Sequence, residues 1–171
     1  MTTVNGLPAH ILLVHAIVVL LPLACALLVV TAAWPAARQH LAGFNALLAI
    51  GVLALVPITT DAGEWLERRV PETALLRDHT ELGDTALWVA VPVAVIAPAI
   101  WWRGREAGAT RRAFLAPRSS AISVIVLVVA VATAGIAVYD VYRTGDSGSK
   151  AAWHGQFSST PRDDGPRRPH S

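Results

Sequence analysis

Histidines are the residues whose type and position in this chain point most directly to chemistry. His15 lies within the first of four long apolar runs, and an ionisable side chain at membrane depth usually has a partner or a function. Its imidazole could bind haem iron or another metal, or carry a proton; it could equally be a neutral ring hydrogen-bonded to a neighbouring helix. His10 lies five residues earlier, about 140° away around a regular helix. The two rings can therefore share one ion only if the helix begins after His10.

Carboxylates and a further histidine lie just outside the second and third apolar runs. Asp61 and Glu64 are three residues apart, as are Glu81 and Asp84, so each pair shares a helix face. With His79 they offer ordinary ligands for zinc or iron. The alternative is local helix electrostatics, because arginines lie four residues from Glu64 and Glu81. The candidate ligands of a metal or haem are therefore His10, His15, His79, Asp61, Glu64, Glu81 and Asp84.

Four apolar runs must position these side chains. Each is long enough to cross a bilayer and contains no Asp, Glu, Lys or Arg. They span residues 11–33, 41–58, 85–102 and 121–139. The short connections predict an all-α bundle of four transmembrane helices in up-down order, formed by residues 1–143. Residues 144–171 are rich in Gly, Ser, Pro and charge, which predicts a mostly disordered polar tail.

Composition supports a membrane protein and excludes other classes. Hydrophobic residues make up 54% of the chain and charged residues 15%, against about 25% charged residues in an average soluble domain. The net charge of +2 is small and the basic residues are spread over the loops, which argues against nucleic acid as a partner. Cys25 is the only cysteine, so an intrachain disulfide and a thiolate-only metal site are excluded. We expect a multi-pass protein of the cell membrane.

Basic residues predict the orientation of the bundle. Four spans place both termini and the middle link on one side of the membrane. The middle link holds Arg68, Arg69 and Arg77, whereas the links on the other side hold six arginines: Arg38, Arg103, Arg105, Arg111, Arg112 and Arg118. The positive-inside rule then places both termini and the middle link on the non-cytoplasmic side. The candidate histidines and carboxylates would gather at this outer face.

Four stretches of the chain resemble, in order, the sequence features of one protein family. They are Gly6–His15 leading into Val19–Pro22, then Thr59–Leu66, His79–Asp84 and Gly145–Trp153. The family is domain of unknown function 2231, a group of small actinobacterial four-helix membrane proteins. The resemblance covers about Gly6 to Gly155. It implies histidines clustered on one side of a four-helix bundle and supplies no established activity.

Two departures from the family pattern affect the expected ligands. Family members usually have His-Pro where this chain has His10-Ile11, and often have histidine where this chain has Asp146. A histidine ligand at position 146, if the family uses one, is absent here, although His154 lies nearby.

The leading prediction is a non-enzymatic membrane protein that binds a divalent metal or a b-type haem near the outer face, in a redox-accessory role beside other membrane redox proteins. His15 and His79 would approach each other between the first and third spans, with carboxylates in supporting or proton-handling roles. Two alternatives stay open. One is a structural or regulatory membrane subunit without a cofactor, and the other is a small proton-coupled transporter.

Overall fold

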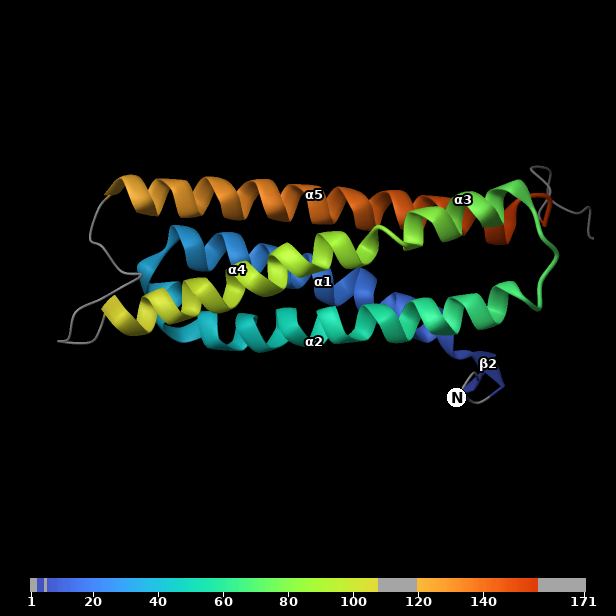
Figure 1. Cartoon of the computed structure of the whole chain (residues 1–171), viewed down its shortest axis with the longest axis horizontal. Helices are drawn as coiled ribbons and strands as arrows, with labels where there is room; N and C mark the ends of the chain where they lie inside the picture. The colour runs from blue at the N-terminus through green and yellow to red at the C-terminus, as the bar shows by residue number, and fades with distance from the viewer. Residues whose placement is uncertain (1–2, 5, 108–119, 157–171) are drawn as a thin grey trace, which may run out of the picture.

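A bundle of long helices forms the molecule (Figure 1). In this computed structural model, residues 3–4, 6–107 and 120–156 are described. The helices are α1 (Ala9–Ala33), α2 (Pro35–Glu67), α3 (Ala74–Gly83), α4 (Ala86–Ala107) and α5 (Ser120–Trp153). Two short antiparallel strands, β1 (Thr3–Val4) and β2 (Leu7–Pro8), precede α1. The predicted all-α bundle is confirmed.

Four helical stretches of the described chain are long and apolar enough to cross a membrane: Ala9–Ala33, Pro35–Glu67, Ala74–Glu106 and Ser120–Trp153. Large apolar side chains such as Val19, Leu47 and Ile125 are exposed along them. In a membrane helix this outward apolar surface faces lipid. The predicted transmembrane helices are therefore supported by both length and surface.

Small residues form most of the buried contacts between the helices. Alanines dominate the core, including Ala24, Ala49, Ala97 and Ala130, with Leu21 and Leu28 among the few large side chains. Apolar association has little driving force in lipid, so close approach of backbones through small residues is what gives good packing. Gly43 illustrates the fit, because a Cβ there would lie 3.0 Å from Nε1 of Trp101.

A buried amide joins α1 and α2 within their apolar runs. In the orientation that satisfies both of its polar atoms, the side chain of Asn45 donates to the carbonyl of Ala24 and accepts from the amide of Leu28, each at 3.2 Å. Such interhelical hydrogen bonds contribute about 0.6 kcal/mol on average in membranes. Asn45 therefore sets the rotation of α2 against α1.

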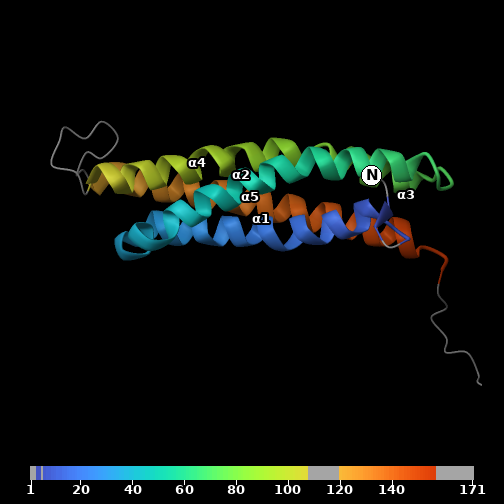
Figure 2. The same ribbon diagram turned by 90° about the horizontal axis from the view of Figure 1, so that it is seen from below.

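The polar segments next to the spans are helical as well. α3 carries Arg77, Asp78 and Glu81, and it extends beyond α4 alongside the end of α5 (Figures 1 and 2). α5 continues to Trp153, so residues 144–153, predicted to begin a disordered tail, are ordered helix. Packing against α3 and the Lys150–Asp146 ion pair at 2.6 Å stabilise this part. The rest of the predicted tail, from residue 157, lies outside the described residues.

The third predicted span, residues 85–102, lies almost wholly in α4, and the separate helix α3 precedes it. α3 begins after Thr73, whose side chain accepts from the amide of Leu76 at 3.1 Å and caps the helix. A turn at Asp84 and Thr85 then separates α3 from α4. This break lets α3 lean against α5, while α4 packs mainly against α2.

Candidate functional site

The beginning of α1, the end of α2, α3 and the end of α5 meet at one end of the bundle, which we call the histidine end (Figure 1). A cavity of about 80 Å³ lies there, enough for a few water molecules. Its polar wall comes from α1, α2, α3 and α5, through His10, Thr59, Thr60, His79, Asp140 and Thr144. The remaining wall is mostly apolar and includes Val14, Ile17, Leu21 and Val56.

His10 is held against the backbone of α2. Its Nδ1 lies 3.0 Å from the carbonyl oxygen of Thr59, and a Cβ at Gly63 would lie 3.0 Å from the ring. A carbonyl oxygen can only accept a hydrogen bond. The neutral ring therefore carries its hydrogen on Nδ1, which leaves a lone pair on Nε2.

His79 is held in the same way against α5. Its Nδ1 lies 3.1 Å from Oγ of Ser147, and that hydroxyl donates its own hydrogen to the carbonyl of Thr144 at 2.9 Å. The serine oxygen is therefore the acceptor, and Nδ1 of His79 is the donor. A Cβ at Gly148 would lie 2.9 Å from the ring, so only glycine fits beside it. The lone pair of the neutral His79 ring is again on Nε2.

The two rings form a pair across the cavity. Their centres are 6.3 Å apart and their planes are inclined by 73°. Burial, and then the positive charge that His10 can carry, lower the pKa of His79, while a hydrogen bond to the backbone of Thr144 opposes this shift. The lowered pKa of His79 favours its neutral form, the form that binds metals.

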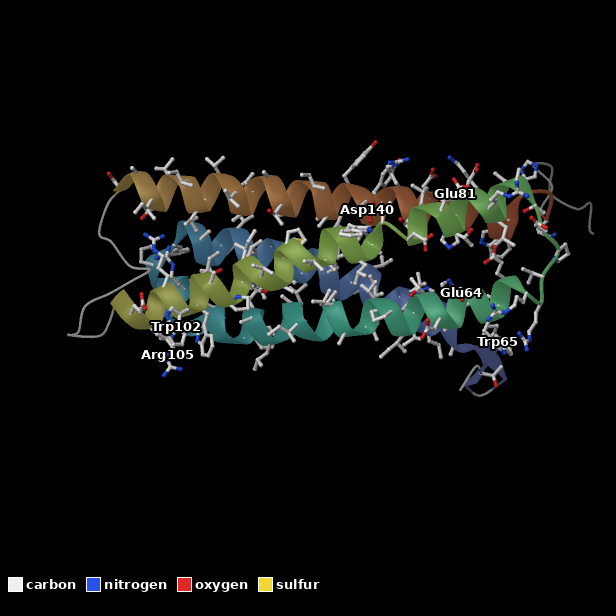
Figure 3. All side chains as sticks on the ribbon, viewed as in Figure 1. Glu64, Trp65, Glu81, Trp102, Arg105 and Asp140 are labelled. Carbon is white, nitrogen blue, oxygen red and sulfur yellow. The ribbon has the colours of Figure 1, made fainter. Side chains whose placement is uncertain are left out.

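Asp140 adds a carboxylate to the same cavity (Figure 3). The hydroxyl of Thr85, in the turn between α3 and α4, donates to Oδ1 of Asp140 in α5 at 2.6 Å. Nearby, Oγ1 of Thr144 is buried and has no hydrogen-bond partner in the described part of the chain. The sequence prediction did not include Asp140 among the ligands. The sequence did hold a signal for it, because Asp140 is the carboxylate that directly follows the apolar run of residues 121–139.

His15 lies on a different side of α1 from the cavity. Its ring is exposed, its Nδ1 lies 2.6 Å from the carbonyl of Ile11 in its own helix, and it does not line the cavity. α1 begins at Ala9, before His10, so the two histidines point about 140° apart. The sequence analysis predicted that His79 would approach His15. In the structure the partner of His79 is His10 instead.

The four predicted carboxylate ligands are exposed and stay outside the cavity: Asp61, Glu64, Glu81 and Asp84. Glu64 forms an ion pair with Arg68 at 3.8 Å, in line with the electrostatic alternative. Figure 3 shows Glu64 and Glu81 on α2 and α3 at the histidine end. Over residues 3–4, 6–107 and 120–156, no three His, Cys, Asp or Glu side chains are arranged to hold a metal ion. His154, also exposed, does not line the cavity.

Comparison with known proteins agrees with the fold. No curated protein and no solved structure matches the chain. A family model described as "Predicted membrane protein (DUF2231)" matches residues 6–161, which include all four spans and every residue of the cavity. The chain belongs to the DUF2231 family of predicted membrane proteins.

Proposed function

We propose that this protein is a non-enzymatic protein of the cell membrane that binds one divalent transition-metal ion between His10 and His79. The observation that carries the proposal is the orientation of the two rings. Each donates its Nδ1 hydrogen to a fixed oxygen, which leaves a lone pair on the Nε2 of each ring, and both residues line one cavity. Metal-binding histidines are commonly oriented by such a hydrogen bond from the other ring nitrogen.

The donors suit a single ion better than a haem. A zinc ion about 2.0–2.1 Å from two ring nitrogens would bring the ring centres to about 5 Å at a tetrahedral angle, so the 6.3 Å pair needs to close by about 1 Å. Asp140 is the carboxylate on the same cavity, and water could complete the coordination. A porphyrin far exceeds a cavity of about 80 Å³. The proposal is therefore a single metal ion and not a haem.

The role of a bound ion would be to fix the junction of the helices or, for iron or copper, to pass an electron to another membrane redox protein. The chain's own residues would hold the ion and keep lipid away from it. The apolar inner wall of the cavity, formed by residues such as Ile17 and Leu21, gives no support to a proton path through the bundle. A proton-coupled transporter is therefore not proposed.

A structural role is the second candidate, and a specific observation favours it. The same polar contacts join His10 to α2, His79 to α5, and Thr85 to Asp140. Glycines at positions 63 and 148 fit closely against the two rings. These contacts would hold the helices together without any ion, as in a structural or regulatory subunit.

Metal analysis and substitution separate the two candidates. The purified wild-type protein should bind one Co²⁺ or Zn²⁺ per chain, measured by elemental analysis and by the visible absorption of Co²⁺. His10→Ala and His79→Ala should each abolish this binding, and the double variant should be no worse. His15→Ala is the matched control and should bind normally. If no metal binds, and His10→Ala and His79→Ala only lower the melting temperature, the structural role is correct. A Soret band in the absorption spectrum of the purified protein would show that a haem is bound and that the haem prediction is correct.

A further inference from the structure

The two histidines of the cavity are oriented by different kinds of acceptor. His10 donates from Nδ1 to the carbonyl oxygen of Thr59 at 3.0 Å, a backbone group that any residue at position 59 would supply. His79 donates from Nδ1 to the side-chain oxygen of Ser147 at 3.1 Å, which a single substitution can remove. The position of the hydrogen on His79 therefore depends on the residue type at position 147, whereas that on His10 depends on the backbone alone.

Ser147 lies in the part of α5 that continues beyond its apolar run, residues 144–153, which we call the α5 extension. Its hydroxyl donates to the carbonyl of Thr144, one turn earlier, at 2.9 Å. A hydroxyl has one hydrogen to donate, and here that hydrogen is used, so the serine oxygen accepts from His79. The carbonyl thus orients the hydroxyl, and the hydroxyl orients the ring.

The polar contacts of the α5 extension with another helix converge on His79. In the described part of the chain, these contacts are the hydrogen bond to Ser147 and the one to the backbone of Thr144. The extension also packs closely on the same ring, because a Cβ at Gly148 would lie 2.9 Å from it. The α5 extension can therefore act on the cavity through the ring of His79.

The tautomer of His79 decides which of its nitrogens can bind a metal. A neutral imidazole has one N–H donor and one nitrogen with a lone pair, and only the lone pair can bind an ion. Nδ1 is engaged with α5, so Nε2 is the nitrogen left for a ligand of the cavity that His79 lines. A hydrogen bond from the other ring nitrogen fixes this tautomer and raises the basicity of the ligand atom.

We propose that Ser147 is the positioning residue of this site, because it fixes the tautomer of His79 in which Nε2 is free to bind a metal. Its effect on metal affinity rests on the proposed function, whereas its effect on the tautomer holds for the metal-free protein as well. Without the serine oxygen, His79 can carry its hydrogen on either nitrogen, so only a part of the molecules is ready to bind. His10 keeps its hydrogen on Nδ1, because its acceptor is a backbone carbonyl.

NMR of the full-length, metal-free protein in a mild detergent, with ¹⁵N-labelled histidine, tests the tautomer. The wild type should carry the hydrogen on Nδ1 of both His10 and His79, with signals assigned from His10→Gln and His79→Gln. Ser147→Ala should give a mixture of tautomers at His79 and leave His10 unchanged, and Ser147→Thr should restore the wild-type state because it keeps the hydroxyl. Ser149→Ala is the matched control. The hydroxyl of Ser149 also donates to the carbonyl three residues earlier, at 2.8 Å, but its side chain is exposed.

Co²⁺ affinity is the second measurement. Ser147→Ala should weaken it about 10–100-fold, whereas Ser147→Thr and Ser149→Ala should bind like the wild type. A wild type that binds no Co²⁺ would reject the proposed function alone, and the tautomer would still decide the role of Ser147.

Four results would overturn the proposal. A wild-type His79 with its hydrogen on Nε2 would mean that the serine donates to the ring. An unchanged tautomer in Ser147→Ala would mean that the carbonyl of Thr144 is sufficient. Equal weakening of Co²⁺ binding by Ser147→Ala and Ser149→Ala would mean a general loosening of α5. A Ser147→Thr protein that behaves like Ser147→Ala would mean that the shape of the residue matters and not its hydroxyl.

Discussion

At the scale of single residues, the histidine end is organised by which ring nitrogen carries hydrogen. The hydroxyl of Ser147 is committed to the carbonyl of Thr144, so it can only accept from His79. The carbonyl of Thr59 imposes the same choice on His10. Protonating either ring adds a second N–H, which needs a hydrogen-bond acceptor. The carboxylate of Asp140 lines the same cavity and is a candidate acceptor.

The lowered pKa of His79 predicts a dependence of stability on pH. The unfolded chain takes up the proton near the ordinary pKa of about 6.5, while the folded protein resists it until a lower pH. Stability should therefore be full above about pH 6.5 and fall as the pH drops toward the folded-state pKa. Thermal unfolding in detergent between pH 7.5 and 5.5 measures this. His79→Gln should flatten the profile and His15→Gln should not. A profile unchanged by His79→Gln would contradict the assignment.

At the scale of elements, two glycines in the same stretch of α5 have opposite surroundings. A Cβ at Gly148 would lie 2.9 Å from the His79 ring, whereas a Cβ at Gly145 would meet nothing within 4 Å. The packing of α3 on α5 therefore requires glycine at position 148, whereas position 145 has room for a side chain.

Substitution by alanine should separate these two glycines. Gly148→Ala should displace His79, break its hydrogen bond to Ser147 and lower stability by about 1 kcal/mol. Gly145→Ala is the control. It lies in a helix with free space and should be neutral, or stabilising by about 0.5–1 kcal/mol. The free energy of unfolding in a denaturant titration measures both. A Gly148→Ala protein as stable as Gly145→Ala would show that the α3–α5 contact adapts easily.

At the scale of the whole molecule, the two ends of the bundle differ in chemistry. The histidine end holds the titratable cavity and both ends of the described chain. The opposite end, which we call the arginine end, holds Arg38, Arg103 and the exposed Trp34 and Trp102. The positive-inside rule predicts that the arginine end faces the cytoplasm.

Reporter fusions test this orientation. A fusion after Pro71, in the link before α3, should report the exterior, and a fusion after Gly108 should report the cytoplasm. The reason is the excess of arginine in the links at the arginine end. An exterior signal at Gly108 would reverse the orientation. The grouping of His10 and His79 at one end would remain.

The sequence by itself determined the all-α class, the number of spans, the family and the end at which the histidines gather. Charge-free apolar runs of bilayer length leave the backbone no structure but helices, and four alternating spans bring residues 10, 61, 79 and 140 to one side. The tertiary structure decided which side chains meet. The start of α1 at Ala9 aims His10 and not His15 at the cavity. Ser147 contacts His79 from 68 residues away, because α5 stays helical beyond its span. Such contacts depend on helix rotation and packing, and no local pattern records them.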